Sequence, residues 1–216
     1  MARLKVGVLI SGRGSNLQAL LDAAAQPGFP AEVALVVSNR ADADGLARAE
    51  QAGVRTVVLE HTRYPDRDSF DRAMEVKLNE AGVGLVCLAG FMRLLSNGFC
   101  ERWHDRLINI HPSLLPAFKG MHVHEAALKA GVRFSGCTVH FVRPAVDSGP
   151  IIVQAAVPVL PRDTSDTLAA RILVAEHRIY PLALRLIAEG RVSVADERVS
   201  IADGHAPEDA LINPLP

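Results

Sequence analysis

The chain has 216 residues, of which 49% are hydrophobic and 22% are charged, so it can bury the core of one globular domain. Its 23 basic and 24 acidic residues leave a net charge of −1, which gives no global field for nucleic acid or a membrane surface. The amino-terminal apolar run, Val6 to Ile10, is too short for a signal peptide or a membrane span. We therefore expect a cytoplasmic protein with small-molecule substrates and no nucleic-acid or membrane partner. The oligomeric state, monomer or homodimer, stays open.

Along the first half of the chain, apolar strand-like runs alternate with helical patterns. This alternation predicts right-handed crossovers and a mostly parallel, open α/β sheet with helices on both faces. The predicted strands are 5–10, 32–37, 55–59, 84–89 and 107–111, and the predicted helices between them are 16–25, 43–52 and 67–81.

The pattern changes after about Phe134. Two strands, 135–142 and 150–157, are joined by the turn-rich segment 144–149 and predict an antiparallel pair at the sheet edge. A long helix, 164–189, follows a capping-type start and should be kinked or broken at Pro181. The last predicted elements are a hairpin, 191–195 and 198–202, and a loosely held tail, 204–216.

Cys87, Cys100 and Cys137 are far apart and form no CxxC pair. An odd number of scattered cysteines is not a disulfide framework, and no metal-ligand spacing is present. We expect three reduced, buried thiols.

The loop 11–16, Ser-Gly-Arg-Gly-Ser-Asn, lies between the first strand and the first helix. Glycines, hydroxyls and free N–H groups at a helix amino terminus predict an anion site. Leu17 replaces the third glycine of a dinucleotide fingerprint, and the lysine of a P-loop is missing, so a terminal monophosphate fits better than NAD or a nucleoside triphosphate. The alternative is a plain turn in which Ser15 or Asn16 caps the helix.

Asn109 and His111 are two residues apart in the strand 107–111, so both side chains point to one face near its carboxyl end. An amide donor and an imidazole suit the attack of an amine on a carbonyl carbon, because the tetrahedral intermediate needs donors and a proton carrier. Asp147 is the natural carboxylate to favour the charged imidazole. Each residue alone also has a structural interpretation, and the sequence does not prove that the three meet.

Six collinear segments, covering the chain to about residue 191, closely resemble the phosphoribosylglycinamide formyltransferase family. The resemblance implies a Rossmann-like formyltransferase fold and transfer of a formyl group from 10-formyltetrahydrofolate to the amino group of glycinamide ribonucleotide, in purine synthesis, without a metal. The segments are SGRGSNLQA (11–19), LAGFMRLLS (88–96), NIHPSLLP (109–116), VHFV (139–142), DSGP (147–150) and EHRIYP (176–181).

The resemblance also assigns roles to residues. It makes Asn109, His111 and Asp147 the catalytic set, and it divides one formyltransferase domain, 1–203, into a phosphate-binding half (about 1–100) and a folate and catalytic half (about 101–203). The implied ribonucleotide site is Gly14, Ser15 and Asn16 for the phosphate, with Leu173, Val174, Ala175 and Glu176 at the ribose end. The implied folate site is Arg67, Met92, Arg93, Leu94, Leu95, Asn109, Arg143, Pro144, Ala145, Val146 and Asp147.

Two departures from the family pattern stand out. Ser148 replaces a glycine of many members, which a loop should tolerate unless its φ is positive. The segment 117–121 varies within the family and should belong to a mobile flap, within about 112–134.

Three alternatives remain. His111, His122 and His124 could be drawn as a metal cluster, although no matching carboxylate motif follows. Relatives that use the same trio, methionyl-tRNA formyltransferase and formyltetrahydrofolate hydrolase, usually carry an extra domain. A non-catalytic folate- or nucleotide-binding module would not need all three catalytic residues.

Overall fold

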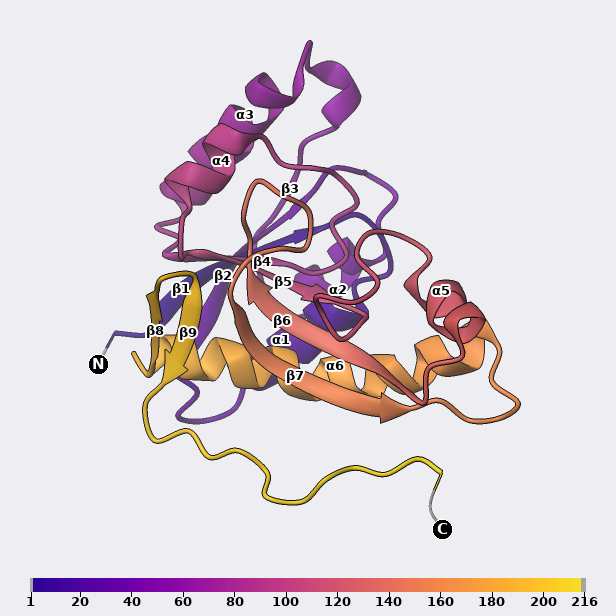
Figure 1. Ribbon diagram of the computed structural model, residues 1–216. Coiled ribbons are helices and arrows are strands. Elements are labelled where there is room, and N and C mark those ends of the chain that lie inside the picture. Colours follow the sequence, from indigo (N-terminus) through magenta and orange to yellow (C-terminus); the bar gives the residue numbers. More distant parts are fainter. Residues whose placement is uncertain (1, 215–216) are drawn as a thin grey trace.

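A seven-stranded sheet in the order β3-β2-β1-β4-β5-β6-β7 forms the centre of the computed structural model, which describes residues 2–214 (Figure 1). Strands β1 to β5 run parallel, and β6 and β7 are antiparallel additions at one edge. The predicted sheet and its antiparallel edge pair are therefore confirmed. The strands are β1 (Leu4–Ile10), β2 (Ala31–Ser38), β3 (Thr56–Val58), β4 (Leu85–Leu88), β5 (Leu107–His111), β6 (Phe134–Phe141) and β7 (Ile151–Pro158), with β8 (Val192–Ala195) and β9 (Arg198–Ile201) in a separate hairpin.

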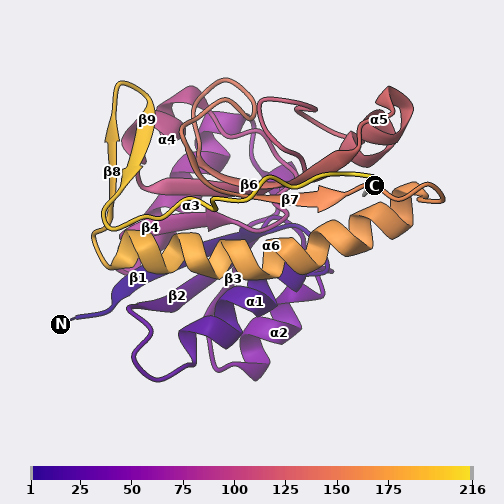
Figure 2. The ribbon, with the colours of Figure 1, turned by 60° about the horizontal axis from the view of Figure 1, so that its bottom comes forward.

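Helices cover both faces of the sheet, as Figure 2 shows for α1, α2 and α6 on one side and α3 and α4 on the other. The helices are α1 (Ser15–Ala24), α2 (Gly45–Gln51), α3 (Arg67–Glu80), α4 (Asn97–Arg102), α5 (Val123–Ala130) and α6 (Ser165–Ala188), with a 3₁₀ turn at His61–Arg63. The sequence patterns did not predict α4 and α5. Each is short, six and eight residues, so neither fills the window of about 11 residues over which apolar periodicity identifies a helix.

Strand β1 explains why the protein has two hydrophobic cores. Val6, Val8 and Ile10 belong to the core under α1, α2 and α6, whereas Leu9 belongs to the core under α3 and α4. Side chains of a strand alternate between faces, and a strand buried on both faces is apolar at nearly every position. The continuous apolar run in the sequence follows from this burial.

Helix α6 begins at a capping box in which Thr164 and Thr167 bond reciprocally, and Gly190 with φ 70° follows its end. Both predicted limits are therefore confirmed within one residue. Pro181 lies inside the helix, which continues to Ala188, so the predicted break does not occur. A proline removes one helical hydrogen bond and its ring crowds the carbonyl of residue i−4, and the packing of α6 on α1, β6 and β7 outweighs that cost.

The three cysteines are free and buried, as predicted. Burial raises the pKa of the Cys87 and Cys137 thiols to about 12. Among residues 2–214, no helix is long and apolar enough to cross a bilayer.

The predicted tail, 204–216, is exposed and has no helix or strand as far as residue 214. Its Asn213 side chain nevertheless donates to the carbonyl oxygen of Arg133 at 2.6 Å. Residues 215 and 216 lie outside the described part of the chain, and the domain limit at residue 203 stays a prediction.

The close approach of β6 and β7 depends on Gly136. A Cβ atom there would lie 1.9 Å from the Ala155 oxygen and 2.9 Å from Leu114 Cδ2, so Gly136→Ala should lower the free energy of unfolding by about 3 kcal/mol. Urea unfolding measures this loss. The control is Gly12→Ala, whose Cβ would meet nothing within 4 Å; equal stability of the two variants would contradict the prediction.

Candidate active site

The loop 11–14 connects β1 to α1 and leaves the helix amino terminus without a side-chain cap. Gly14 is the N-cap residue with φ 71°, so neither Ser15 nor Asn16 caps the helix. Backbone N–H groups at an uncapped helix start attract anions. They border a cavity of about 300 Å³, which is lined by Ser11, Gly12, Arg13, Gly14, Ser15, Asn16, Ala89, Gly90 and Met92.

Helix α2 supports this loop from behind. The Gly45 N–H donates to the Gly12 oxygen at 3.0 Å, and Arg48 Nε donates to the Arg13 oxygen at 2.9 Å. A Cβ on Gly14 would lie 2.6 Å from Gly45 Cα, and its positive φ also favours glycine. Gly14 is therefore required by space as well as by conformation.

Asn16 is joined to α6 by a hydrogen bond across 160 residues: its Nδ2 donates to Glu176 Oε2 at 2.6 Å. Glu176 is 6% exposed, and burial raises the pKa of its carboxyl group, while the Asn16 hydrogen bond and the His111 charge lower it. The structure thus brings the predicted phosphate and ribose ends together. Leu173, Val174 and Ala175 precede Glu176 on α6 but line neither the cavity at the loop 11–16 nor the apolar pocket described below.

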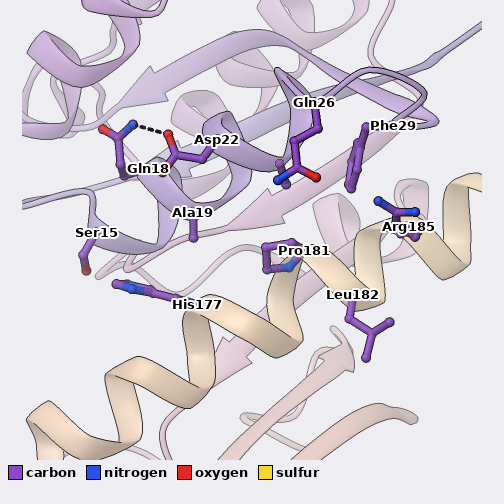
Figure 3. Close-up of a pocket in the computed structure, with 11 residues that line it drawn as sticks. Ser15, Gln18, Ala19, Asp22, Gln26, Phe29, His177, Pro181, Leu182 and Arg185 are labelled. Carbon is purple, nitrogen blue, oxygen red and sulfur yellow. Dashed lines mark hydrogen bonds between the residues drawn. The ribbon is translucent and has the colours of Figure 1, made fainter.

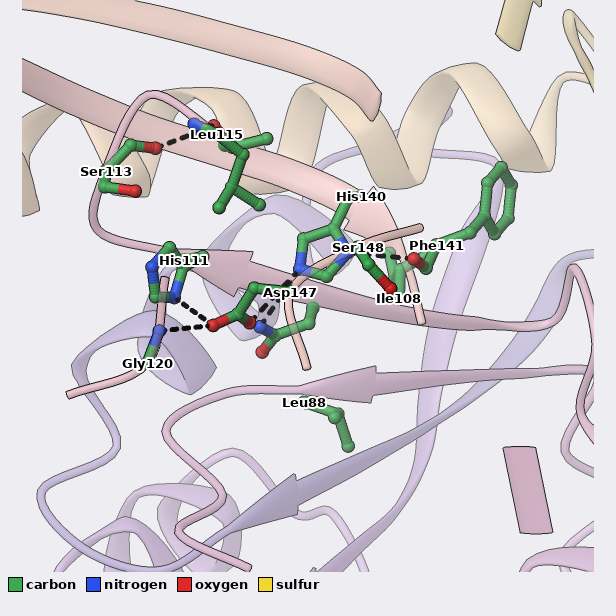
Figure 4. A network of polar contacts seen from close by, with 12 residues as sticks. Leu88, Ile108, His111, Ser113, Leu115, Gly120, His140, Phe141, Asp147 and Ser148 are labelled. Atoms are coloured by element: carbon green, nitrogen blue, oxygen red, sulfur yellow. Dashed lines mark hydrogen bonds and ion pairs between the residues drawn. The ribbon is translucent and has the colours of Figure 1, made fainter. Parts of the chain in front are cut away.

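His111 and Asp147 lie together at the end of β5 (Figure 4). Asn109, two residues before His111, lines the same pocket as Asp147. His111 Nδ1 is 3.4 Å from Asp147 Oδ2, and His111 Nε2 is 2.9 Å from the carbonyl oxygen of Phe118. Both ring nitrogens therefore face oxygen atoms. His111 is 5% exposed, so this site holds a buried, hydrogen-bonded imidazole.

Asp147 owes its position to backbone geometry. Its φ is 46°, a left-handed conformation that aspartate tolerates better than most residues. Its Oδ2 accepts the Gly120 N–H at 2.9 Å, so the predicted flap is attached directly to the Asp147 carboxylate. Ser148 does not have the positive φ and donates to the Ala145 oxygen at 2.7 Å, which explains why serine is tolerated there.

His140 is a site residue that the sequence patterns did not single out. It pairs opposite Asn109 in the β5–β6 ladder, and residues directly opposite each other share one face of a sheet. Its Nε2 is 3.3 Å from Asn109 Nδ2, and its Nδ1 is 2.8 Å from the Phe141 oxygen. Burial lowers the pKa of His140, so the neutral ring donates through Nδ1 and accepts the Asn109 amide through Nε2. Only the strand register reveals this contact.

A second pocket, of about 200 Å³, opens beside the trio, and it is called the apolar pocket here because more large apolar side chains line it than line the cavity at the loop 11–16. Two of the predicted folate residues do not line this pocket. Met92 lies at the loop 11–16, here called the phosphate loop, where its N–H donates to Ser11 Oγ at 2.8 Å. Ala145 is not in the pocket lining either. The pocket is lined by the predicted folate residues Arg67, Arg93, Leu94, Leu95, Asn109, Arg143, Pro144, Val146 and Asp147, together with Leu88, Phe91, Asn97, Cys100, His140 and Val142.

The segment 88–95 forms a wall common to both cavities. Leu88, Phe91 and Arg93 line the apolar pocket, whereas Ala89, Gly90 and Met92 line the cavity at the phosphate loop. Ligands in the two cavities would therefore be separated by one segment of backbone.

A third cavity, of about 450 Å³, lies between α1 and α6 (Figure 3). Of the predicted site residues it includes only Ser15, and the Phe29 ring in its wall is covered by the Arg185 guanidinium at 5.1 Å. Across residues 2–214, no three His, Cys, Asp or Glu side chains are grouped so that they could hold a metal ion.

A family model described as formyl transferase matches residues 4–184 of the chain. The chain is 44% identical over 201 residues to phosphoribosylglycinamide formyltransferase of Escherichia coli, covering 93% of this chain and 94% of that protein. It is 52% identical over 194 residues to the trifunctional purine biosynthetic protein adenosine-3 of Gallus gallus, covering 90% of this chain but only 19% of that protein.

A solved structure of glycinamide ribonucleotide transformylase 1 from Symbiobacterium toebii superposes with a TM-score of 0.91 at 53% identity, covering 93% of this chain and 95% of that one. The chain spans about a fifth of the length of the trifunctional relatives, but nearly all of the E. coli protein. On the family match and these identities, the chain belongs to the formyl transferase family.

Proposed function

We propose that this chain transfers the formyl group of 10-formyltetrahydrofolate to the amino group of glycinamide ribonucleotide, yielding the N-formyl product and tetrahydrofolate in purine biosynthesis. One observation carries the proposal: Asn109, His111 and Asp147 meet beside an apolar pocket that shares a wall with an anion-binding cavity. The names of the E. coli and S. toebii relatives agree with it.

The reaction needs one bond to form and one to break. The acceptor amine attacks the formyl carbon to form a C–N bond, and the bond from that carbon to N10 of the folate then breaks. A proton leaves the amine and ends on N10 of tetrahydrofolate. A proton carrier and a donor for the intermediate's oxygen accelerate both steps.

Asn109 is suited to stabilise the oxyanion. One N–H of its amide is directed to His140 Nε2 at 3.3 Å, which fixes the orientation of the amide and leaves its second N–H for the substrate oxygen. Such preorganisation avoids reorientation during the reaction. His140 thus acts in the proposed mechanism as a positioning residue.

His111 and Asp147 form the proposed proton relay. The carboxylate of Asp147, 3.4 Å from His111 Nδ1, stabilises a positive imidazole, which can donate to the oxyanion and exchange the proton of the amine. The Phe118 carbonyl oxygen is hydrogen-bonded to His111 Nε2, so this nitrogen is not available to a substrate. Movement of the flap would free this nitrogen when substrates bind.

The phosphate of the ribonucleotide fits the loop 11–16, where Gly14, Ser15 and Asn16 surround the start of α1. The Glu176 carboxylate, which accepts a hydrogen bond from Asn16, is proposed to accept further hydrogen bonds from the ribose hydroxyl groups. We also propose a cytoplasmic location, which the three free, buried thiols favour.

Purified protein, glycinamide ribonucleotide and a 10-formyl folate test the function directly. We expect release of the deformylated folate, followed by absorbance, that requires the acceptor. Release without acceptor would indicate a hydrolase, and folate binding without release would indicate a binding module.

Asp147→Asn should lower kcat by about 100-fold or more, because the relay loses its carboxylate. The KM for the ribonucleotide should stay within about twofold. Asparagine also tolerates a positive φ, so the backbone is kept. Asp203→Asn, at an exposed residue with φ 54°, is the matched control; equal losses of kcat in both variants would contradict the assigned role.

Glu176→Gln should be more stable than the wild type at about pH 8, with a difference that shrinks toward about pH 4. Because burial raises the pKa of Glu176 above its ordinary 4.5, the folded state holds the proton more tightly, and ionisation destabilises the fold as pH rises. Glutamine still accepts the Asn16 amide but cannot ionise.

The measurement is urea unfolding across this pH range. In Glu176→Gln the KM for the ribonucleotide should also rise about tenfold, because the proposed hydrogen bond from a ribose hydroxyl loses its charged acceptor. Glu208→Gln, in the exposed tail, is the control. An effect on stability that does not vary with pH would count against a buried, ionised Glu176.

A further inference from the structure

The loop 142–149, here called the donor loop, connects β6 to β7 and carries Asp147. At its far end Gly149 packs so closely that a Cβ would lie 1.8 Å from the Phe141 oxygen. Pro144, Ala145 and Val146, between the two ends, are exposed. Besides the Gly120 contact of Asp147, the loop is held at its near end, at Arg143.

Arg143 is held by two carboxylates from other parts of the chain. Its Nε is 2.7 Å and one terminal nitrogen is 3.1 Å from the two oxygens of Glu197, and the same terminal nitrogen is 2.7 Å from Asp105 Oδ1. The Arg143 side chain is 10% exposed. Two-pronged arginine–carboxylate contacts are geometrically specific, and partial burial reduces their screening by water.

These contacts change the interpretation of Arg143. The resemblance implied a folate contact, and Arg143 does line the apolar pocket. Its donors, however, are already directed to Glu197, Asp105 and the Val142 carbonyl. Arg143 can therefore form part of the pocket wall while its guanidinium holds the loop.

Glu197 lies in the turn of the terminal hairpin, with φ 56°. The hairpin lies beyond the residues 4–184 that match the family model. It is fixed at its base, where Arg191 donates to the Ala202 oxygen and accepts the Ala202 N–H. The turn therefore projects from a fixed base, and it meets the donor loop through Glu197.

We propose that Glu197 is a positioning residue for folate binding, acting through Arg143 on the donor loop. This inference rests on the proposed function, since it concerns the folate site. Without the Glu197 carboxylate, the Arg143 guanidinium keeps Asp105 and the neighbouring Val142 carbonyl as partners, and the pocket wall 143–147 samples more conformations. Folate binding weakens, whereas the ribonucleotide cavity, which contains no donor-loop residue, is unaffected.

The test compares Glu197→Ala, Glu197→Gln, Arg143→Ala and the double variant Arg143→Ala with Glu197→Ala. Equilibrium binding of tetrahydrofolate and the KM for each substrate are measured. We expect Glu197→Ala to raise the folate Kd and KM about three- to tenfold, with the ribonucleotide KM within about twofold. Glu197→Gln should lose less folate affinity than Glu197→Ala. The double variant should bind folate no more weakly than Arg143→Ala alone.

Glu189→Ala is the matched control, because Glu189 pairs with Arg191 at 3.5 Å near the hairpin base but does not contact the donor loop. Its folate affinity should equal that of the wild type. Equal folate affinity of Glu197→Ala and wild type would overturn the inference. So would losses of folate affinity in Arg143→Ala and Glu197→Ala that add up in the double variant, or equal increases of the folate KM and the ribonucleotide KM in Glu197→Ala. A wild type that binds no folate would instead overturn the proposed function and, with it, this inference.

Discussion

The site depends on the pairing of β5, which is parallel to β4 on one side and antiparallel to β6 on the other. The antiparallel register sets Asn109 opposite His140. Strand β6 ends at Phe141, and the donor loop that follows it places Asp147 beside His111. A shift of one residue in this register would move His140 to the other face and leave the Asn109 amide without its partner.

Burial gives this polar group its chemical character. His111 and His140 lie inside the fold, where an unpaired polar group is costly and a paired one is strengthened by the low local dielectric. Each ring nitrogen of these two residues faces a carbonyl, a carboxylate or an amide. A network satisfied in this way holds the orientations that acyl transfer needs, and the flap and the donor loop are part of it through Phe118 and Asp147.

The two substrate regions are supported in different ways. The phosphate loop rests on close backbone packing, with Gly14 against Gly45, so its shape is rigid. The donor loop is exposed in its middle and held by charges at Arg143. Rigid backbone would suit the small, constant phosphate of the proposed acceptor, whereas a loop held by ion pairs would adjust to the larger folate proposed as the donor.

The sequence by itself predicted the alternation of strands and helices along most of the chain and the limits of α6, because apolar periodicity and capping residues act over a few neighbouring residues. It also predicted an anion site from the glycines at the start of α1, and its resemblance to formyltransferases named the three catalytic candidates. Helices α4 and α5 were too short for the signal of apolar periodicity. The contacts of Asn16 with Glu176, Asn109 with His140 and Arg143 with Glu197 join residues 160, 31 and 54 positions apart. Only the tertiary structure decided them, since strand order and register bring such residues together and no local pattern encodes either.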